Sequence, residues 1–155
     1  MPVFSPHQFL KEETSTIGTS EPDQTLWISE VGQLTQFGAF IEILQPGSRS
    51  SKKHWHSKED EMIYVLEGEI TVIEGAHESV LHPGDVATFL ANVAVGHFLE
   101  NRSQSPTKCL VVGPRAPFDT ITYPDHARVC HRDRSQPEDI WTDLQGVPAP
   151  SPHSN

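Results

Sequence analysis

The residues best suited to chemistry lie in one stretch, residues 47–68, which reads GSRSSKKHWHSKEDEMIYVLEG. His54 and His56 lie two positions apart, so on an extended strand their side chains point to the same side, roughly 7 Å apart along the chain. The polar residues 57–60 can then reverse the chain, so that Glu61 opens the returning strand and faces the two imidazoles. Imidazoles and carboxylates are common ligands of transition metals. The spacing therefore predicts a metal site that needs a third imidazole from elsewhere.

Two other carboxylates, those of Glu59 and Asp60, compete with Glu61 for this role. Side chains alternate between the two faces of a regular strand, so Glu61 shares one face with Ile63 and Val65. That face is apolar and is expected to point inward, whereas Glu59 and Asp60 fall in the turn. We therefore expect Glu61 to be the ligand.

Composition and charge narrow the classes of function. The chain has 155 residues, about the size of one domain, with 21 acidic and 11 basic residues and a formal net charge of −10. Such acidity argues against nucleic-acid binding, which requires clustered basic residues. We see no membrane span and no secretory signal, so we expect a cytoplasmic protein. The two cysteines, Cys109 and Cys130, are too few for a disulfide framework, and we expect free thiols.

Short segments rich in β-branched and aromatic residues alternate with turns, and helical periodicity is nearly absent. Besides the hairpin in residues 47–68, we expect strands at 26–31, 37–44, 69–74, 79–81, 86–90, 97–99, 107–112 and 116–123. This pattern is typical of an all-β sandwich or barrel. We expect residues 1–36 to form an N-terminal extension with an edge strand and residues 37–124 to form the barrel. Residues 125–155 are expected to form a loose C-terminal extension with a disordered, Pro- and Ser-rich end.

Two groups of residues resemble the two sequence motifs of the cupin superfamily. The first group is His54-Trp55-His56, Glu61 and Gly68, and the second is Gly84-Asp85, His97 and Asn101. With its HWH, EDE, YVLEG and YPDH segments, the sequence is similar to small single-domain metal-binding cupins. This resemblance implies a double-stranded β-helix, or jelly-roll, barrel. It also implies that His97 supplies the missing imidazole, which completes a set of four ligands for one divalent metal ion per chain.

The resemblance departs from the usual motifs in two loops. The spacing between Gly47 and His54 is one residue longer than usual, and residues 90–92 stand where the second motif usually has a proline. Neither change removes a ligand. Both loops border the mouth of the expected barrel, so the resemblance does not indicate the substrate.

Three imidazoles and one carboxylate suit Fe, Mn, Zn, Ni, Co or Cu, and the ligand types do not distinguish among these metals. Such a set leaves coordination positions open for a small-molecule substrate, toward which the metal can act as a Lewis acid. We expect an apolar pocket lined by Ile63, Val65, Phe89 and Leu99.

The first functional hypothesis is an enzyme of the isomerase or lyase/cyclase type that carries out non-redox chemistry on a small oxygenated metabolite. An Fe(II)-dependent dioxygenase is one alternative, and a non-catalytic small-molecule binding cupin is another. The catalytic residues are not indicated, although His126 in the YPDH segment is a candidate if that segment folds over the barrel mouth. The cupin resemblance implies a homodimer. Met62, Tyr64 and Leu66 are expected to point outward, which fits either a dimer interface or a sheet covered by the chain's own ends.

Overall fold

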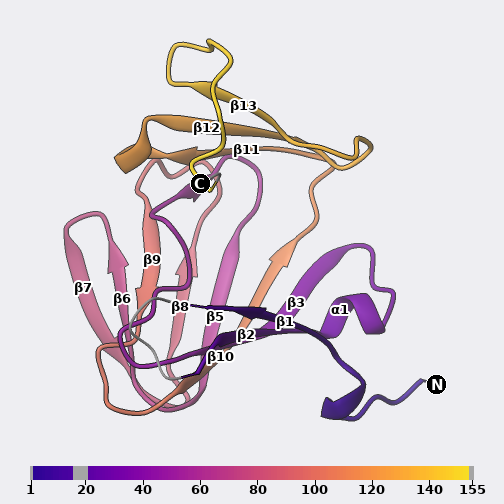
Figure 1. Cartoon of the computed structure of the whole chain (residues 1–155), viewed down its shortest axis with the longest axis vertical. Helices are drawn as coiled ribbons and strands as arrows, with labels where there is room; N and C mark the ends of the chain where they lie inside the picture. The colour runs from indigo at the N-terminus through magenta and orange to yellow at the C-terminus, as the bar shows by residue number, and fades with distance from the viewer. Residues whose placement is uncertain (1, 16–20, 154–155) are drawn as a thin grey trace.

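Strands make up nearly all the regular structure of the protein, a computed structural model that describes residues 2–15 and 21–153 (Figure 1). The strands are β1 (Leu10–Thr14), β2 (Asp23–Trp27), β3 (Phe37–Leu44), β4 (Trp55–His56), β5 (Glu61–Glu67), β6 (Ile70–Glu74), β7 (His77–Leu81), β8 (Val86–Phe89), β9 (His97–Glu100), β10 (Thr107–Pro114), β11 (Phe118–Tyr123), β12 (Arg128–Asp133) and β13 (Ile140–Asp143). The helical elements are α1 (Ile28–Val31) and two short 3-10 helices, Pro6–Gln8 and Pro124–His126. The expected all-β class is confirmed.

The strands form three antiparallel sheets. A six-stranded sheet has the order β1-β2-β3-β10-β5-β8, a three-stranded sheet has the order β7-β6-β9, and a four-stranded sheet has the order β13-β12-β11-β4. The six- and three-stranded sheets form the body of the barrel, and β11, β12 and β13 lie across one end of it, at the top of Figure 1. Because β4 pairs with β11, this end sheet lies next to the histidines expected to bind metal.

The main core lies between the six- and three-stranded sheets. Its buried side chains are Leu44, Ile63, Val65, Ile70, Val72, Leu81, Phe89, Leu99, Cys109 and Val111. Along β5, Ile63 and Val65 are buried while the residues between and beside them are exposed. Glu61 shares the parity of these two buried residues, so β5 carries its carboxylate toward the inside of the barrel, as expected.

Two residues of the sequence motifs hold turns in place. Gly68 has a φ of +80°, and a Cβ atom there would lie 2.8 Å from the carbonyl oxygen of Pro106, so this turn requires glycine. The fully buried Asn101 donates hydrogen bonds from its side-chain amide to the carbonyl oxygens of Leu44 and Ser105, at 2.9 and 2.8 Å. These contacts fasten the turn after β9 to the end of β3.

The strand expected at residues 26–31 is wrong in its second half. Strand β2 ends at Trp27, and the following residues form the short helix α1. The buried Ser29 hydroxyl accepts the amide hydrogen of Ala39 at 3.0 Å. The Ser29 side chain therefore takes the hydrogen bond of β3 that a longer β2 strand would have taken. The chain after Trp27 can then leave the sheet and form α1.

The C-terminal segment differs from the loose extension expected for residues 125–155, because β12 and β13 continue the sheet that contains β4 and β11. The ring centroids of Tyr123 and Trp141 lie 5.5 Å apart, and His153 contacts both rings, at 5.4 and 6.0 Å. Strand β12 has the sequence RVCHRD, in which only Val129 and Cys130 are apolar, and Cys130 is fully buried. So few apolar residues give no clear strand pattern, which is why the sequence alone does not indicate this strand.

Several other expectations concern the ends of the chain and its surroundings. Strand β1 forms the edge of the six-stranded sheet, within the expected N-terminal extension. Cys109 and Cys130 are both free and buried, as expected. No helix within the described residues is long and apolar enough to cross a membrane. The domain boundaries, the cytoplasmic location and the homodimer stay predictions.

Candidate metal centre

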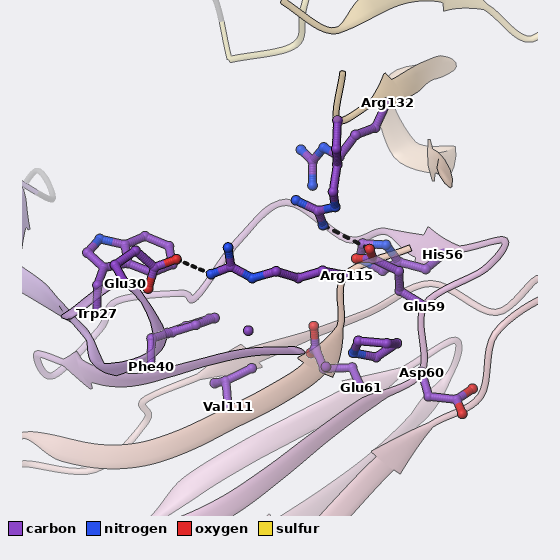
Figure 2. A pocket seen from close by; sticks show the side chains of 14 residues that line it. Trp27, Glu30, Phe40, His56, Glu59, Asp60, Glu61, Val111, Arg115 and Arg132 are labelled. Carbon is purple, nitrogen blue, oxygen red and sulfur yellow. Dashed lines mark hydrogen bonds and ion pairs between the residues drawn. The ribbon is translucent and has the colours of Figure 1, made fainter. Parts of the chain in front are cut away.

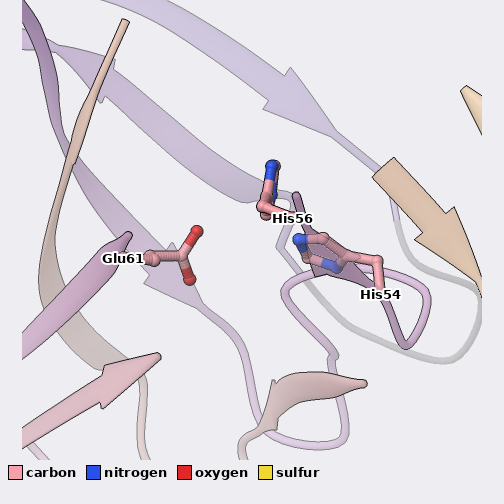
Figure 3. A group of neighbouring side chains, drawn as sticks. All are labelled: His54, His56 and Glu61. Carbon is pink, nitrogen blue, oxygen red and sulfur yellow. The ribbon is translucent and has the colours of Figure 1, made fainter. Parts of the chain in front are cut away.

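The four expected ligands come together at the barrel end that the four-stranded sheet covers. The backbone of His54, just before β4, pairs with that of His97 at the start of β9, and Glu61 opens β5. One ligand atom from each of His54, His56 and Glu61 lies within 4.8 Å of the other two, and Figure 3 shows these side chains grouped together. His97 Nε2 lies 3.5 Å from Glu61 Oε1, and the His97 and His54 ring centroids are 5.0 Å apart. The role of these four residues as ligands stays a prediction.

Hydrogen bonds fix the protonated nitrogen of two of the imidazoles. His54 Nδ1 lies 2.9 Å from the carbonyl oxygen of Lys52, which can only accept, so Nδ1 carries the proton. His56 Nδ1 likewise donates to the Asp119 carboxylate at 2.6 Å. In both rings Nε2 is therefore left with its lone pair, which is the form that binds a metal.

Several hydrogen bonds together hold the Asp119 carboxylate in place. Its side chain has no solvent exposure, and besides His56 it accepts hydrogen bonds from the Ser57 hydroxyl and from the amides of Ser57, Lys58 and Thr120. Burial opposes ionisation, but the bonds from His56 and Ser57 outweigh it and lower the pKa of Asp119 to about 2. Asp119 therefore stays charged and keeps the His56 ring in one orientation.

His97 has an unusual environment for a buried imidazole. Both of its ring nitrogens are buried, Nδ1 has no hydrogen-bond partner in residues 2–15 and 21–153, and Nε2 has only the Glu61 carboxylate, at the long distance of 3.5 Å. Its ring is stacked on Phe89, with centroids 3.6 Å apart and planes 4° from parallel. An unpaired buried polar atom costs about 1–3 kcal/mol, so such a ring calls for a ligand. A metal ion bound to Nε2 beside Glu61 would satisfy one of these nitrogens, so the residues present fit a metal.

The protonation states also suit metal binding, which needs neutral imidazoles and an ionised carboxylate. Burial, reinforced by His56 and His97 and opposed by Glu61, lowers the pKa of His54 to about 4. For Glu61, burial favours the neutral acid, but the neighbouring histidines outweigh it and lower the pKa of the carboxyl group. At neutral pH His54 is therefore a neutral donor and Glu61 an anion.

The rival carboxylates are occupied elsewhere. Asp60 accepts the amide hydrogen of Ala91 at 2.7 Å. Glu59 accepts the amide hydrogen of Ala116 at 2.9 Å and pairs with Arg134 at 2.8 Å. Both side chains thus hold loops, as expected for residues that fall in the turn before β5.

A second group of possible donors shares one residue with the first. One atom from each of His56, Glu59 and Asp119 also lies within 4.8 Å of the others. Asp119 Oδ1 accepts four hydrogen bonds, and Oδ2 accepts the proton of the His56 Nδ1 atom that faces it. This group is therefore a hydrogen-bonded support for His56 rather than a separate metal site.

A cavity of about 400 Å³ is lined by Glu61 and Phe89 but by none of the three histidines. Two other cavities are lined by Glu61 together with at least one of the histidines. The larger of these two, of about 390 Å³, is lined by Trp27, Glu30, Gly38, Phe40, His56, Glu59, Asp60, Glu61, Val111, Gly113, Pro114, Arg115, Arg132 and Arg134 (Figure 2). The smaller, of about 150 Å³, is lined by Phe40, Glu42, Ser50, Ser51, His54, Glu61, Ile63, His97, Phe98, Leu99 and Val111. Phe40, Glu61 and Val111 line both cavities, so the Glu61 side chain borders each of them.

The expected apolar lining is found only in part. Ile63 and Leu99 line the smaller cavity, Phe89 packs against His97, and Val65 belongs to the core. The larger cavity is instead rich in charged groups, among them three arginines. Those arginines follow or belong to β10 and β12, strands whose place beside the site the sequence does not reveal.

Comparison with known proteins gives the family. The family model for the cupin domain matches residues 40–113. A crystal structure described as a sugar phosphate isomerase from a cupin superfamily, from Silicibacter pomeroyi, is 30% identical, with a TM-score of 0.84 over 97% of this chain and 98% of that one. The chain belongs to the cupin superfamily. The expected jelly-roll barrel is therefore confirmed.

Two further solved structures show the same cupin fold. A protein from Acidithiobacillus ferrooxidans is 24% identical, with a TM-score of 0.75 over 84% of this chain and 81% of that one. A protein from Thermotoga maritima, described as a predicted oxalate decarboxylase, is 20% identical, with a TM-score of 0.60 over 74% of this chain and 100% of that one. No curated protein matches the sequence.

Glu42 is a further carboxyl group inside this cupin barrel that sequence reasoning missed. It lines the smaller cavity with His54, Glu61 and His97. Burial, with the charges of Glu61 and Asp23, raises the pKa of Glu42 to about 8, so the group is protonated at neutral pH. Its parity on β3, two residues from the inward Phe40, was the signal that could have identified it.

His126, the candidate in the YPDH segment, lies elsewhere. It is exposed at the end of the 3-10 helix after β11 and lines a separate hollow with Arg49, Lys52 and Lys53. His126 lines neither cavity at the metal centre. The YPDH segment contributes Tyr123 instead, whose ring stacks on His54 with centroids 5.7 Å apart.

Proposed function

We propose that this cupin is a metal-dependent enzyme of the isomerase or lyase/cyclase type, acting on a small oxygenated metabolite without redox chemistry. The observation that carries the proposal is the convergence of three imidazoles and one carboxylate beside a cavity of about 390 Å³. That volume lies within the range of small-molecule sites. The similar cupin from Silicibacter pomeroyi, described as a sugar phosphate isomerase, makes isomerisation the first reaction to test.

The residues that would hold the metal are His54, His56, Glu61 and His97. A divalent ion bound there would supply a Lewis acid for a carbonyl or hydroxyl oxygen of the substrate. With three neutral imidazoles and one carboxylate, the centre would keep a net positive charge, which favours an oxygen anion at an open position.

Other residues would orient the ligands and keep water away. Asp119 holds the His56 ring, and Phe89 covers one face of the His97 ring. Glu42 holds a proton beside the smaller cavity at neutral pH. It is the one ionisable residue of that lining outside the four expected ligands, so it is well placed to exchange a proton with a bound molecule.

Proton exchange provides a direct test. The protein is stripped of metal, reloaded separately with each of the six candidate metals, and incubated without oxygen in D₂O with a panel of aldoses, ketoses and their phosphates. We expect metal-dependent conversion or deuterium incorporation next to a carbonyl group, observed by NMR. His97→Ala should abolish it, and His77→Ala, an exposed change on β7, should retain it.

Two other results would contradict the proposal. Oxygen consumption with Fe(II), together with inactivity in the absence of oxygen, would identify a dioxygenase. Binding of a small molecule without any exchange or turnover under all metals would identify a binding cupin.

A further inference from the structure

Three arginine side chains gather at the larger cavity. Arg115 follows β10, Arg132 lies in β12, and Arg134 follows β12. Figure 2 shows the Arg115 side chain extending toward Glu30, with its guanidinium beside the Glu30 carboxylate, and Arg132 at the top of the view. Their side chains are only 27% to 35% exposed. In a chain with a net charge of −10, three half-buried cations in one cavity point to a specific role.

Each guanidinium is held by a carboxylate. The pairs are Arg115 with Glu30, Arg132 with Asp139 at 3.1 Å, and Arg134 with Glu59 at 2.8 Å. All hydrogen bonds of the three arginine side chains within the described residues leave from Nε or Nη2, and none leaves from Nη1. A guanidinium carries five N–H donors in a rigid plane, so these anchors orient it and leave donors for a ligand.

The same cavity also offers an apolar wall. The Trp27 and Phe40 rings lie 5.0 Å apart between centroids, and Val111 continues this surface. The metal-ligand candidates His56 and Glu61 occupy another part of the lining. The cavity therefore combines oriented cationic donors, a surface for a carbon skeleton, and a metal centre.

We propose that Arg115, Arg132 and Arg134 form an oxyanion subsite, and that the substrate is a small metabolite with a phosphate or carboxylate group. This proposal rests on the proposed function in one respect, because it places another oxygen of the same molecule at the metal centre. Phosphate and carboxylate share the planar pairs of acceptor oxygens that a guanidinium matches with parallel N–H bonds.

The carboxylate anchors determine how this subsite recognises an anion. Since each arginine is already neutralised by a partner, selectivity comes from N–H donors at fixed positions rather than from excess positive charge. Binding should therefore depend less on salt than binding to an exposed basic patch would. The hollow beside His126 provides a natural comparison, because its Arg49 also pairs with a carboxylate, Glu100, at 2.9 Å.

The test uses the metal-free full chain, with inorganic phosphate and acetate as separate probes at constant ionic strength. A ligand that binds the folded state raises the melting temperature by mass action, and the rise gives its dissociation constant. We expect at least one probe to stabilise the protein. Arg132→Gln and Arg134→Gln should weaken that binding about tenfold or more, since each removes a charged donor. Arg49→Gln should leave it unchanged.

Lysine variants and the comparison of the two probes make the result specific. Arg132→Lys and Arg134→Lys retain the charge but lose the forked donors, so they test the geometry if a glutamine variant is too unstable to measure. Stabilisation by phosphate alone would identify a phosphate group on the substrate, and stabilisation by acetate alone would identify a carboxylate group. No stabilisation by either probe, or equal stabilisation of the cavity variants and Arg49→Gln, would overturn the subsite.

This outcome is independent of the metal proposal. Phosphate binding without metal binding would retain the subsite and reject the metal-dependent function. Full metal loading, with no effect of the arginine variants on anion binding, would retain the metal site and reject the oxyanion subsite.

Discussion

Asp119 accepts the Nδ1 proton of His56 at 2.6 Å, although 63 residues separate the two in the sequence. Strand β11 carries Asp119 and pairs with β4, which ends at His56. The sheet that contains β11 and β4 therefore supports the candidate metal centre. This relationship gives the C-terminal third of the chain a function that its charged, proline-containing sequence does not suggest.

Removing this support should weaken metal binding without abolishing it. In Asp119→Ala the His56 ring loses its fixed orientation, and we expect about 10- to 100-fold lower metal affinity. Competition with a chromophoric chelator measures it. Asp85→Ala is the matched control, because Asp85 is exposed and caps the His82 amide at 2.8 Å. Equal affinities in the two variants would show that Asp119 does not position a ligand.

A second prediction concerns stability at two glycine turns. It separates the cost of backbone strain from the cost of a steric clash. Gly47 and Gly68 both have positive φ, of +85° and +80°. A Cβ atom would meet nothing within 4 Å at Gly47 but would lie 2.8 Å from the Pro106 carbonyl oxygen at Gly68. Gly47→Ala should cost about 1–2 kcal/mol, from backbone strain alone.

Gly68→Ala should cost roughly 1–3 kcal/mol more than Gly47→Ala, because overpacking adds to the strain. Urea unfolding of the metal-free variants gives both values. If the two substitutions reduced the free energy of unfolding equally, the close approach at Gly68 would have no energetic weight.

The carboxyl group of Glu42, which lines the smaller cavity, predicts a dependence of stability on pH. Burial, then the charges of Glu61 and Asp23, raise its pKa in the folded protein to about 8 from 4.5. The folded state binds this proton more tightly than the unfolded chain. The resulting stabilisation is complete below about pH 4.5 and is lost as the pH rises through about 8.

Glu42→Gln should remove this pH-dependent contribution to the free energy of unfolding. Between pH 5 and 8, metal-free wild type should lose stability relative to the variant by at most about 1.4 kcal/mol per pH unit. Urea unfolding at several pH values measures the difference. Glu67→Gln, at an exposed residue paired with Lys108, should track the wild type. Parallel curves for wild type and Glu42→Gln would contradict the protonated state of Glu42.

What the sequence predicts well is local. His54 and His56 flank a single residue, and the alternation of Glu61 with Ile63 and Val65 follows from strand geometry alone. The same parity was available for Glu42 within β3, but a lone acid in an apolar strand gave no reason to look for a partner. The alternation along a strand thus predicts which face of the sheet a side chain lies on, but not which residues it contacts there.

The remaining features depend on contacts between distant strands. Asp119 and Arg132 reach the centre only because β11 pairs with β4 and β12 pairs with β11. No spacing in a single sequence encodes such pairing. The helix α1 was missed for a different reason: the buried Ser29 hydroxyl replaces a backbone partner, which propensity does not reveal.

The central claim is that His97 completes a four-residue metal site. The decisive measurement is the metal content of purified protein after stripping and reloading, by elemental analysis, for wild type, His97→Ala and His77→Ala. We predict about one ion per chain in wild type and His77→Ala, and less than about 0.2 in His97→Ala with the fold retained by circular dichroism. Full occupancy in His97→Ala, or less than about 0.2 ions in wild type with every metal, would contradict the account.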